Sequence, residues 1–233
     1  MSLVADGVTA GYHGRRVLTG ASLTVGAGET VGLRGPSGSG KSTLVRVLAL
    51  LHEPESGHVT VDGERITGVR HRVPAVVRTR IGVLFQSPRA ASDPRLTLAD
   101  LIAEPLRAVR RPRDEIAGRV AELADRAGLT ADLLARRPHA VSDGQLQRAC
   151  LARALAHRPR YLLCDEATAM LDASTQALVA SVITAEQEAT GMGVLVVSHD
   201  PALLARWASR VADLPSGRAP KRLTEPRRHG ATH

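Results

Sequence analysis

A glycine-rich segment near the start of the chain carries the residue types that bind phosphates. Residues 35–42 read GPSGSGKS and match the pattern G-x-x-x-x-G-K-[ST], between an expected strand and an expected helix. Glycines let the backbone turn so that successive N–H groups face phosphate oxygens, and the helix N-terminus adds the positive end of its dipole. Lys41 is expected to reach the β and γ phosphates of a nucleoside triphosphate, and Ser42 to hold Mg²⁺. The candidate phosphate-binding residues are Gly35, Pro36, Ser37, Gly38, Ser39, Gly40, Lys41, Ser42 and Thr43.

A pair of carboxylates follows the apolar run of residues 161–164. These are Asp165 and Glu166. Because ligands bind at the carboxyl ends of strands in open α/β sheets, we expect the pair to project toward the phosphates. Asp165 suits Mg²⁺, directly or through water, and Glu166 suits a base that polarises the attacking water. Without a phosphate site nearby, such a pair would more simply begin a loop.

Two further polar side chains also follow apolar runs. Gln86 comes directly after residues 81–85, and His199 directly after residues 194–198. Gln86 could contact Mg²⁺ and water, and His199 could hydrogen-bond the γ-phosphate and orient the water. Taken alone, His199 fits a loop or capping histidine better. Since four expected strands end in groups suited to one chemistry, we expect these groups to form one catalytic site.

The elements that must position these residues follow an α/β pattern. Apolar runs typical of a sheet covered on both faces predict a mainly parallel core sheet, and residues 41–51 predict a helix. Between residues 96 and 158 helical spacing replaces the β-branched runs, which predicts a helical insertion. The chain thus divides into a core of residues 1–95 and 159–214, a helical subdomain of residues 96–158 and a basic tail of residues 215–233. The expected strands are 3–10, 23–25, 30–33, 59–61, 81–85, 161–165 and 194–198.

Composition limits the classes of protein that remain. The 233 residues carry a formal net charge of +8, with 43% hydrophobic and 23% charged residues, which is an ordinary globular composition. One Trp, two Tyr and one Phe are too few for a single-strand nucleic-acid platform of stacked rings. The longest apolar run, residues 47–51, is far shorter than the roughly 20 residues of a membrane-spanning helix. We therefore expect a single globular domain that does not itself cross a bilayer.

Cysteine usage and the two chain ends bear on location. Cys150 and Cys164 are too few for a disulfide framework and lack metal-site spacing, so we expect buried thiols in a reduced cytoplasmic setting. Residues 1–6 lack the basic and apolar regions of a secretory signal. The cations between residues 218 and 228 are explained most simply as a solvated end, and attraction to an anionic membrane surface is the sharper alternative.

Taken in order, the motifs resemble those of the nucleotide-binding subunits of ABC transporters from residue 12 to about residue 214. Besides the residues above, the resemblance rests on Tyr12, on residues 141–145 (VSDGQ) and on residues 170–172 (MLD). The segment 141–145 separates this family from other P-loop proteins. The resemblance implies the ABC ATPase fold, which is a P-loop NTPase core with a mainly parallel sheet, an N-terminal antiparallel β part and an inserted α-helical subdomain.

The resemblance also implies a role for each matching residue. Tyr12 stacks on adenine, and Asp172 communicates between sites across a subunit interface. In that interface a second ATPase subunit, identical or related, packs head to tail so that two ATP molecules are enclosed. The signature residues that face the partner's ATP are Ser142, Asp143, Gly144 and Gln145. The catalytic residues are Lys41, Gln86, Glu166 and His199, and the Mg²⁺ ligands are Ser42, Gln86 and Asp165.

The implied function is ATP binding and hydrolysis that powers import of a small solute through separate transmembrane permease subunits. Such a chain lies peripherally on the cytoplasmic face of the membrane, and an extracytoplasmic solute-binding protein takes part indirectly. The helical insertion and the Gln86 loop are expected to receive short cytoplasmic helices of the permease. Residues 85–95 and 102–106 resemble the oligopeptide, dipeptide and nickel importer group, although the C-terminal extension common in that group is not expected here.

Two residues depart from the family pattern. Asp143 stands where the family usually has Gly, and it brings a carboxylate near a polyanion; unless it points away, its charge opposes closure of the dimer. Ala167 stands where Pro usually follows the carboxylate pair. Neither removes an expected catalytic side chain, but the turnover rate and the equality of the two sites stay open.

Two other classes of function remain as alternatives. A soluble, non-transport ABC-type ATPase acting on nucleic acid is favoured by the net charge of +8. The scarcity of aromatic residues, the small size and the lack of a coiled-coil or zinc insertion oppose it. A small-molecule kinase with a P-loop is a third interpretation, which the segment 141–145 opposes. The motifs therefore favour the transport ATPase.

Overall fold

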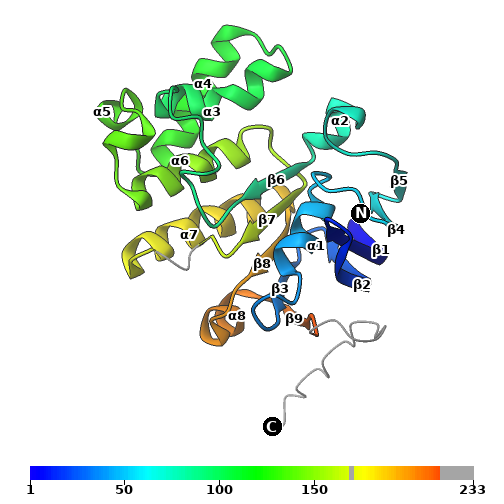
Figure 1. Cartoon of the computed structure of the whole chain (residues 1–233). Coiled ribbons are helices and arrows are strands. Elements are labelled where there is room, and N and C mark those ends of the chain that lie inside the picture. Colours follow the sequence, from blue (N-terminus) through cyan, green and yellow to red (C-terminus); the bar gives the residue numbers. More distant parts are fainter. Residues whose placement is uncertain (168–170, 216–233) are drawn as a thin grey trace.

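The computed structural model describes residues 1–167 and 171–215, which form two sheets with helices packed around them (Figure 1). The basic tail, apart from residue 215, and Met170 lie outside the described residues. An antiparallel sheet has the order β2-β1-β4-β5, and a parallel sheet has the order β6-β7-β8-β3-β9. The antiparallel strands are β1 (Ser2–Tyr12), β2 (Arg15–Gly26), β4 (Ser56–Val61) and β5 (Glu64–Ile66). The parallel strands are β3 (Thr30–Arg34), β6 (Ile81–Leu84), β7 (Tyr161–Asp165), β8 (Gly193–Val197) and β9 (Arg210–Asp213).

The antiparallel sheet is built on a tight hairpin. Strands β1 and β2 pair down to Tyr12 opposite Arg15, which leaves His13 and Gly14 as the turn. Both turn residues have positive φ, 52° and 77°, as the two-residue turn that matches strand twist requires. The hairpin thereby fixes Tyr12 at the end of β1.

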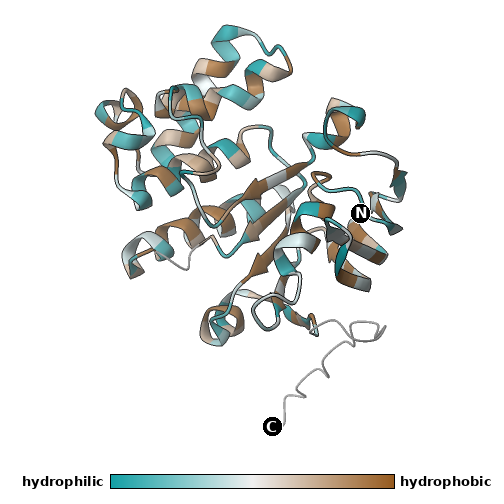
Figure 2. Cartoon of the chain, in the orientation of Figure 1, coloured by the Kyte–Doolittle hydropathy of each residue, from teal (hydrophilic) through white to brown (hydrophobic). Residues whose placement is uncertain are grey.

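The parallel sheet separates two hydrophobic cores. Every residue of β7 and β8 is buried, as a sheet covered on both faces requires. Alternate residues of β7 face opposite sides: Leu162 and Cys164 pack in the core formed with α6 and α7, whereas Tyr161 and Leu163 pack with α1 and the antiparallel sheet. Figure 2 shows these central strands as the most hydrophobic part of the chain. The expected α/β class, with a mainly parallel core sheet, is confirmed.

The helices lie where the insertion is expected and around the parallel sheet. In Figure 1, α3 to α6 gather at one end of the molecule, opposite the antiparallel sheet. They occupy residues 98–155, so the expected helical stretch is present, while its exact boundaries at 96 and 158 stay predictions. The helices are α1 (Lys41–Leu48), α2 (Ala75–Arg78), α3 (Leu98–Ala108), α4 (Arg113–Arg126), α5 (Ala131–Leu134), α6 (Asp143–Leu155), α7 (Ala173–Thr190) and α8 (Pro201–Trp207). Two short 3₁₀ helices, η1 (Arg70–Arg72) and η2 (Pro138–Ala140), complete the set in the described part of the chain.

Local capping explains where several helices begin. The Ser142 hydroxyl accepts a hydrogen bond from the Gln145 backbone N–H, and the Gln145 side chain accepts one from the Ser142 N–H, which is a capping box at the start of α6. The Asp172 carboxylate caps α7 by accepting a hydrogen bond from the Thr175 N–H. Both residues therefore fix helix N-termini.

The structure also bears on the two cysteines and on membrane-spanning helices. Cys150 and Cys164 are buried, with 7% and 3% of their surface exposed, as expected. In residues 1–167 and 171–215, every helix is too short or too polar to span a membrane.

Candidate functional site

The phosphate-binding loop connects β3 to α1 and is shaped by glycine. Gly40 has a φ of 100°, and a Cβ there would lie only 2.6 Å from a methyl carbon of Leu18, so the loop tolerates no side chain at this position. Lys41 begins α1 and is 5% exposed. Its Nζ donates hydrogen bonds to the backbone oxygens of Gly35 at 2.9 Å and Pro36 at 3.1 Å. The ammonium group is therefore held over the loop by acceptors that a phosphate could replace.

A cavity of about 370 Å³ opens beside this loop. It brings together the loop with the residues that follow β6, β7 and β8, namely Gln86, Glu166 and His199. Parallel strands place their carboxyl ends at one edge of the sheet, which explains the convergence. The residues that line the cavity are Val17, Ser37, Gly38, Gly40, Lys41, Ser42, Thr43, Gln86, Glu166 and His199.

Glu166 is fixed at the centre of this group. Its backbone has a φ of 49°, in the left-handed region that side chains rarely adopt, and its N–H donates to the oxygen of Val197 at 3.1 Å. Its Oε1 lies 2.7 Å from His199 Nε2 and 4.0 Å from Lys41 Nζ. Such backbone strain is found at functional sites, where the surrounding contacts hold it in place.

Asp165 is the last residue of β7 and is 5% exposed. The Ser42 hydroxyl donates a hydrogen bond to its Oδ1 at 3.1 Å. Burial raises the pKa of Asp165, and the charge of Glu166 adds to this, although the Ser42 hydrogen bond and nearby cations act in the opposite direction. An additional positive charge at this point would favour the ionised carboxylate.

The oxygen donors of Ser42, Asp165 and Gln86 fit a hard divalent cation. Serine hydroxyl, carboxylate and amide oxygens are suited to Mg²⁺, which keeps several waters and uses few protein ligands. Among the described residues there is no group of three or more His, Cys, Asp and Glu that could hold a metal ion. The donor set therefore fits a cation held jointly with phosphate oxygens and does not fit a metal bound by the protein alone.

Tyr12 lies apart from the residues that line the cavity. Its ring packs against His52, with centroids 4.6 Å apart, and Arg46 donates a hydrogen bond to its hydroxyl at 3.1 Å. The side chain is 36% exposed. The hydroxyl bond to Arg46 and the ring contact with His52 thus orient Tyr12, and the side chain stays accessible to solvent.

The signature segment and Asp172 are also separate from the phosphate cavity. Ser142 and Asp143 are exposed, and Gly144 and Gln145 continue α6. Asp143 lines a second hollow, of about 190 Å³, to which Gln86 also contributes. Hydrogen bonds from Ser174 and Thr175 lower the pKa of Asp172. One chain alone therefore does not bring the signature residues to the phosphate loop.

Gln147 was not singled out by the sequence pattern, although it joins two parts of the site. It is 1% exposed, and its Nε2 donates to the backbone oxygens of Phe85 at 3.1 Å and Ala167 at 2.8 Å. These oxygens flank Gln86 and Glu166 in sequence. The only signal was an amide among the buried apolar positions of α6.

Comparisons with known proteins agree with this geometry. A family model described as "ABC transporter" matches residues 18–169. The methionine import ATP-binding protein MetN of Caulobacter vibrioides is 39% identical over 205 residues, covering 88% of this chain and 61% of that protein. The oligopeptide transport ATP-binding protein OppF of Escherichia coli K12 is 36% identical over 206 residues, covering 88% and 62%. The chain thus spans less than two thirds of the length of these curated relatives.

Solved structures show the same fold. The dimeric bacterial ABC transporter cassette MJ0796 superimposes with a TM-score of 0.83 at 30% identity, covering 92% of this chain and 95% of that one. A post-hydrolysis dimer of the same cassette, bound to ADP and Pi, gives a TM-score of 0.82 at 29% identity, with coverages of 93% and 97%.

Proposed function

Because this chain belongs to the ABC transporter family, as its motifs predict, we propose that it binds and hydrolyses ATP to drive solute import through separate membrane subunits. The observation that carries the proposal is the meeting of Lys41, Glu166 and His199 around one cavity, with Glu166 Oε1 2.7 Å from His199 Nε2. The names of the relatives above, both import ATP-binding proteins, support the transport role.

Binding begins with the triphosphate displacing the backbone acceptors of Lys41. The ammonium group exchanges its bonds to Gly35 and Pro36 for phosphate oxygens, which are charged and therefore form stronger hydrogen bonds. The N–H groups at the start of α1 face the same phosphates. Tyr12, already oriented by His52 and Arg46, stacks on the adenine.

Ser42, Gln86 and Asp165 would hold Mg²⁺ beside the phosphates. When bound, the cation would supply positive charge that stabilises the negative charge developing during phosphoryl transfer. The Ser42 hydroxyl donates a hydrogen bond to the Asp165 carboxylate at 3.1 Å, so two of the three proposed ligands already lie side by side.

Glu166 and His199 then act on the water and the γ-phosphate. When the γ-phosphate arrives, His199 Nε2 exchanges its contact with Glu166 Oε1 for a hydrogen bond to a phosphate oxygen, and Glu166 Oε1 is freed to accept a proton from water. The water oxygen bonds to the γ-phosphorus, the bond to the ADP oxygen breaks, and the proton passes to Glu166. The products are ADP and phosphate.

A second ATPase subunit, either a copy of this chain or a related one, completes the site. The N-terminus of α6, with Ser142 and Gly144, faces the γ-phosphate of the partner's ATP, because a helix N-terminus attracts anions. Asp172 lies in the same interface and communicates between the two sites. The dimeric state named for the similar cassette supports this arrangement.

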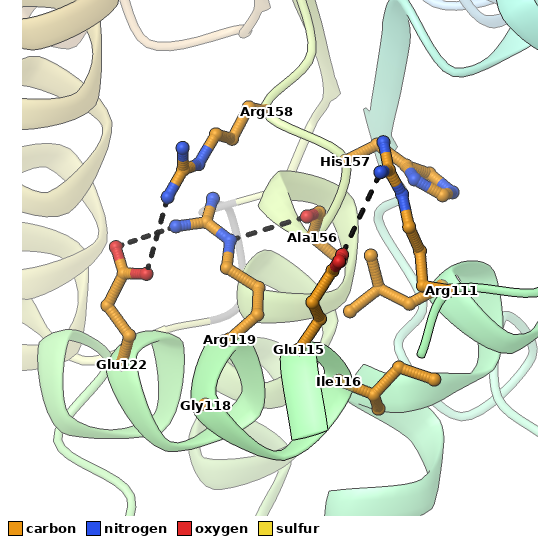
Figure 3. A pocket seen from close by; sticks show the side chains of 10 residues that line it. Arg111, Glu115, Ile116, Gly118, Arg119, Glu122, Ala156, His157 and Arg158 are labelled. Atoms are coloured by element: carbon orange, nitrogen blue, oxygen red, sulfur yellow. Dashed lines mark hydrogen bonds and ion pairs between the residues drawn. The ribbon is translucent and has the colours of Figure 1, made fainter. Parts of the chain in front are cut away.

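The permease would dock at two hollows beside α4 and α6. One, of about 210 Å³, is lined by residues of β6, α3 and α6, and the other, of about 420 Å³, by residues of α4 and the segment after α6. His157 lines both, so they adjoin. Figure 3 shows the larger hollow with Arg111 and Glu115 on one side and Arg119, Glu122 and Arg158 on the other. Paired charges around an apolar floor suit a short amphipathic helix.

The imported solute is a peptide or nickel, from the resemblance of residues 85–95. The relatives' names favour an amino acid or peptide. The chain would act at the cytoplasmic face of the membrane, with a solute-binding protein on the opposite face. Action on nucleic acid is not supported, since the relatives named here are importers.

The test is to purify the chain with its natural membrane partners in vesicles and measure ATP hydrolysis as solutes are added. We expect peptides to stimulate hydrolysis, with Ni²⁺ tested in parallel, and the Glu166→Gln complex to show no stimulation. Equal hydrolysis with every solute, together with release of the chain from the vesicles, would contradict the transport role.

A further inference from the structure

The carboxylate of Asp143, the first residue of α6, is paired with the guanidinium of Arg89. Arg89 Nε donates to Asp143 Oδ1 at 2.7 Å, as both a hydrogen bond and an ion pair. The same guanidinium donates from Nη1 to the oxygen of Pro138 at 2.9 Å and from Nη2 to the oxygen of Val141 at 3.1 Å. All three nitrogens of the Arg89 guanidinium are thus engaged by the segment that leads into α6.

The backbone segment that carries Arg89 is itself held against α6 by hydrogen bonds. Its own segment follows Gln86, and the Phe85 oxygen at its start accepts from Gln147. Further along, Ser92 bonds back to the oxygen of Pro88 at 2.6 Å, and Arg153 Nη1 donates to the oxygen of Ala91 at 2.9 Å. Contacts on both sides of Arg89 therefore fix the position from which its side chain extends.

The position of Arg89 matters because the N-terminus of α6 is proposed to bind a phosphate. A helix N-terminus attracts an anion through a partial positive charge of about half an elementary charge. An unpaired carboxylate at its first residue would cancel this attraction and repel a phosphate. A guanidinium in direct contact with Asp143 removes the net charge and draws the carboxylate toward the Gln86 segment.

We infer that Arg89 is a positioning residue that neutralises Asp143 and orients the start of α6, so that the signature segment can accept the γ-phosphate of the second subunit's ATP. This inference rests on the proposed ATP-driven dimer. It goes beyond it by linking the departure at Asp143 to a compensating residue 54 positions earlier in the chain. The two side chains of the Arg89–Asp143 pair are about half exposed, and exposed ion pairs contribute little to folding stability, so the effect of their charges is expected on dimer closure.

A double-mutant cycle tests the inference in a Glu166→Gln background, which is expected to retain ATP in a closed dimer. The variants are Arg89→Ala, Asp143→Asn and both together, with Arg95→Ala as a matched control that removes an exposed Asp93 pair on the same segment. Dimerisation is measured by light scattering against ATP concentration. ATP binding to the monomer is measured separately with a fluorescent analogue at low protein concentration.

Arg89→Ala should weaken ATP-driven dimerisation about tenfold while the monomer's affinity for ATP stays within about threefold. Asp143→Asn should restore the part of the loss that comes from the unpaired carboxylate, and the part that comes from the lost bonds to the Pro138 and Val141 oxygens should remain. Arg95→Ala should change neither quantity. Raising the salt concentration should also reduce the Arg89→Ala penalty, because repulsion between Asp143 and phosphate is screened. A penalty that is equal with and without the Asp143→Asn substitution, and insensitive to salt, would overturn the inference. If the Glu166→Gln parent itself fails to dimerise with ATP, the proposed dimer fails, and the inference falls with it.

Discussion

His199 Nε2 lies 2.7 Å from Glu166 Oε1, and Lys41 Nζ lies 4.0 Å from the same oxygen. His199, which follows β8, and Lys41, which begins α1, thus both approach one carboxylate oxygen of Glu166, which follows β7. The left-handed backbone of Glu166 aims its side chain into the cavity. In the proposed mechanism, an entering γ-phosphate competes with the Glu166 carboxylate for both Lys41 and His199, so that ATP binding frees Glu166 to act as the base.

Replacing His199 should slow chemistry more than binding. His199→Ala removes a hydrogen-bond donor to the transferred phosphoryl group, so we expect kcat to fall about 100-fold while KM for ATP changes less than about threefold. Steady-state phosphate release measures both constants. The exposed His71 on η1 provides the control, and His71→Ala should behave as the unmodified chain. An unchanged kcat for His199→Ala would remove His199 from the mechanism.

Replacing Lys41 should instead weaken ATP binding strongly. Lys41→Ala loses charge-assisted hydrogen bonds worth about 1.5–3 kcal/mol each, so the Kd for ATP should rise about 100-fold, measured by calorimetry. Lys221, the other lysine of the chain, offers a matched control because it lies far from the motif in sequence. ATP affinity that survives in Lys41→Ala would contradict the assignment of the phosphate loop.

Removing the Gln147 amide should disturb both loops that it joins. Gln147→Leu leaves the backbone oxygens of Phe85 and Ala167 buried without their donor, which should cost about 1–3 kcal/mol of unfolding free energy. We expect kcat to fall as well, since Gln86 and Glu166 lie next to these oxygens. Urea unfolding and phosphate release on the same samples measure the two effects. Unchanged stability would mean that water replaces the amide.

The fold was predictable where an element is buried on both faces. Strand β7 spans residues 161–165, as expected, because a fully buried strand reads as one apolar run. Strands β5 and β9 were not expected, since they are only three and four residues long and owe their conformation to pairing with β4 and β3. The helix expected over residues 41–51 ends at Leu48, because Leu50 adopts a positive φ of 59°.

The candidate site was predictable as far as its residues lie in contiguous motifs. The phosphate loop and the strand-end residues carry their own local context, and the parallel sheet brings them to one edge. Arg89 and Gln147 have no such context, because their partners Asp143 and Phe85 are 54 and 62 residues away. For the same reason, the charge of Asp143 could be noticed in the sequence, but its compensation could not.

A partly buried carboxylate in the β4–β5 turn, that of Asp62, should make the stability depend on pH. Burial raises the pKa of Asp62, but hydrogen bonds from Tyr161 and Arg160, at 2.6 and 2.7 Å, and the charges of Arg160 and Arg80 bring it below its ordinary value. A lowered folded-state pKa adds stability above about pH 4 that is lost as the pH falls through the folded value.

Asp62→Asn should therefore lower the unfolding free energy at pH 7 by about 2 kcal/mol, from hydrogen bonds to a charged group. The difference from the unmodified chain should shrink as the pH falls below about 4. Urea unfolding at a series of pH values measures it. Tyr161→Phe should show a smaller loss with the same pH trend, and a loss that is independent of pH would show that the charge of Asp62 does not matter.

Glu166 is the proposed base for ATP hydrolysis, and single-turnover phosphate release by Glu166→Gln tests this role, with ATP affinity determined on the same protein. The amide keeps the shape of the side chain but cannot accept the proton. We therefore expect hydrolysis to slow by about 10²- to 10⁴-fold while the Kd for ATP stays within about threefold. Hydrolysis by Glu166→Gln at the rate of the unmodified chain would show that Glu166 is not the base.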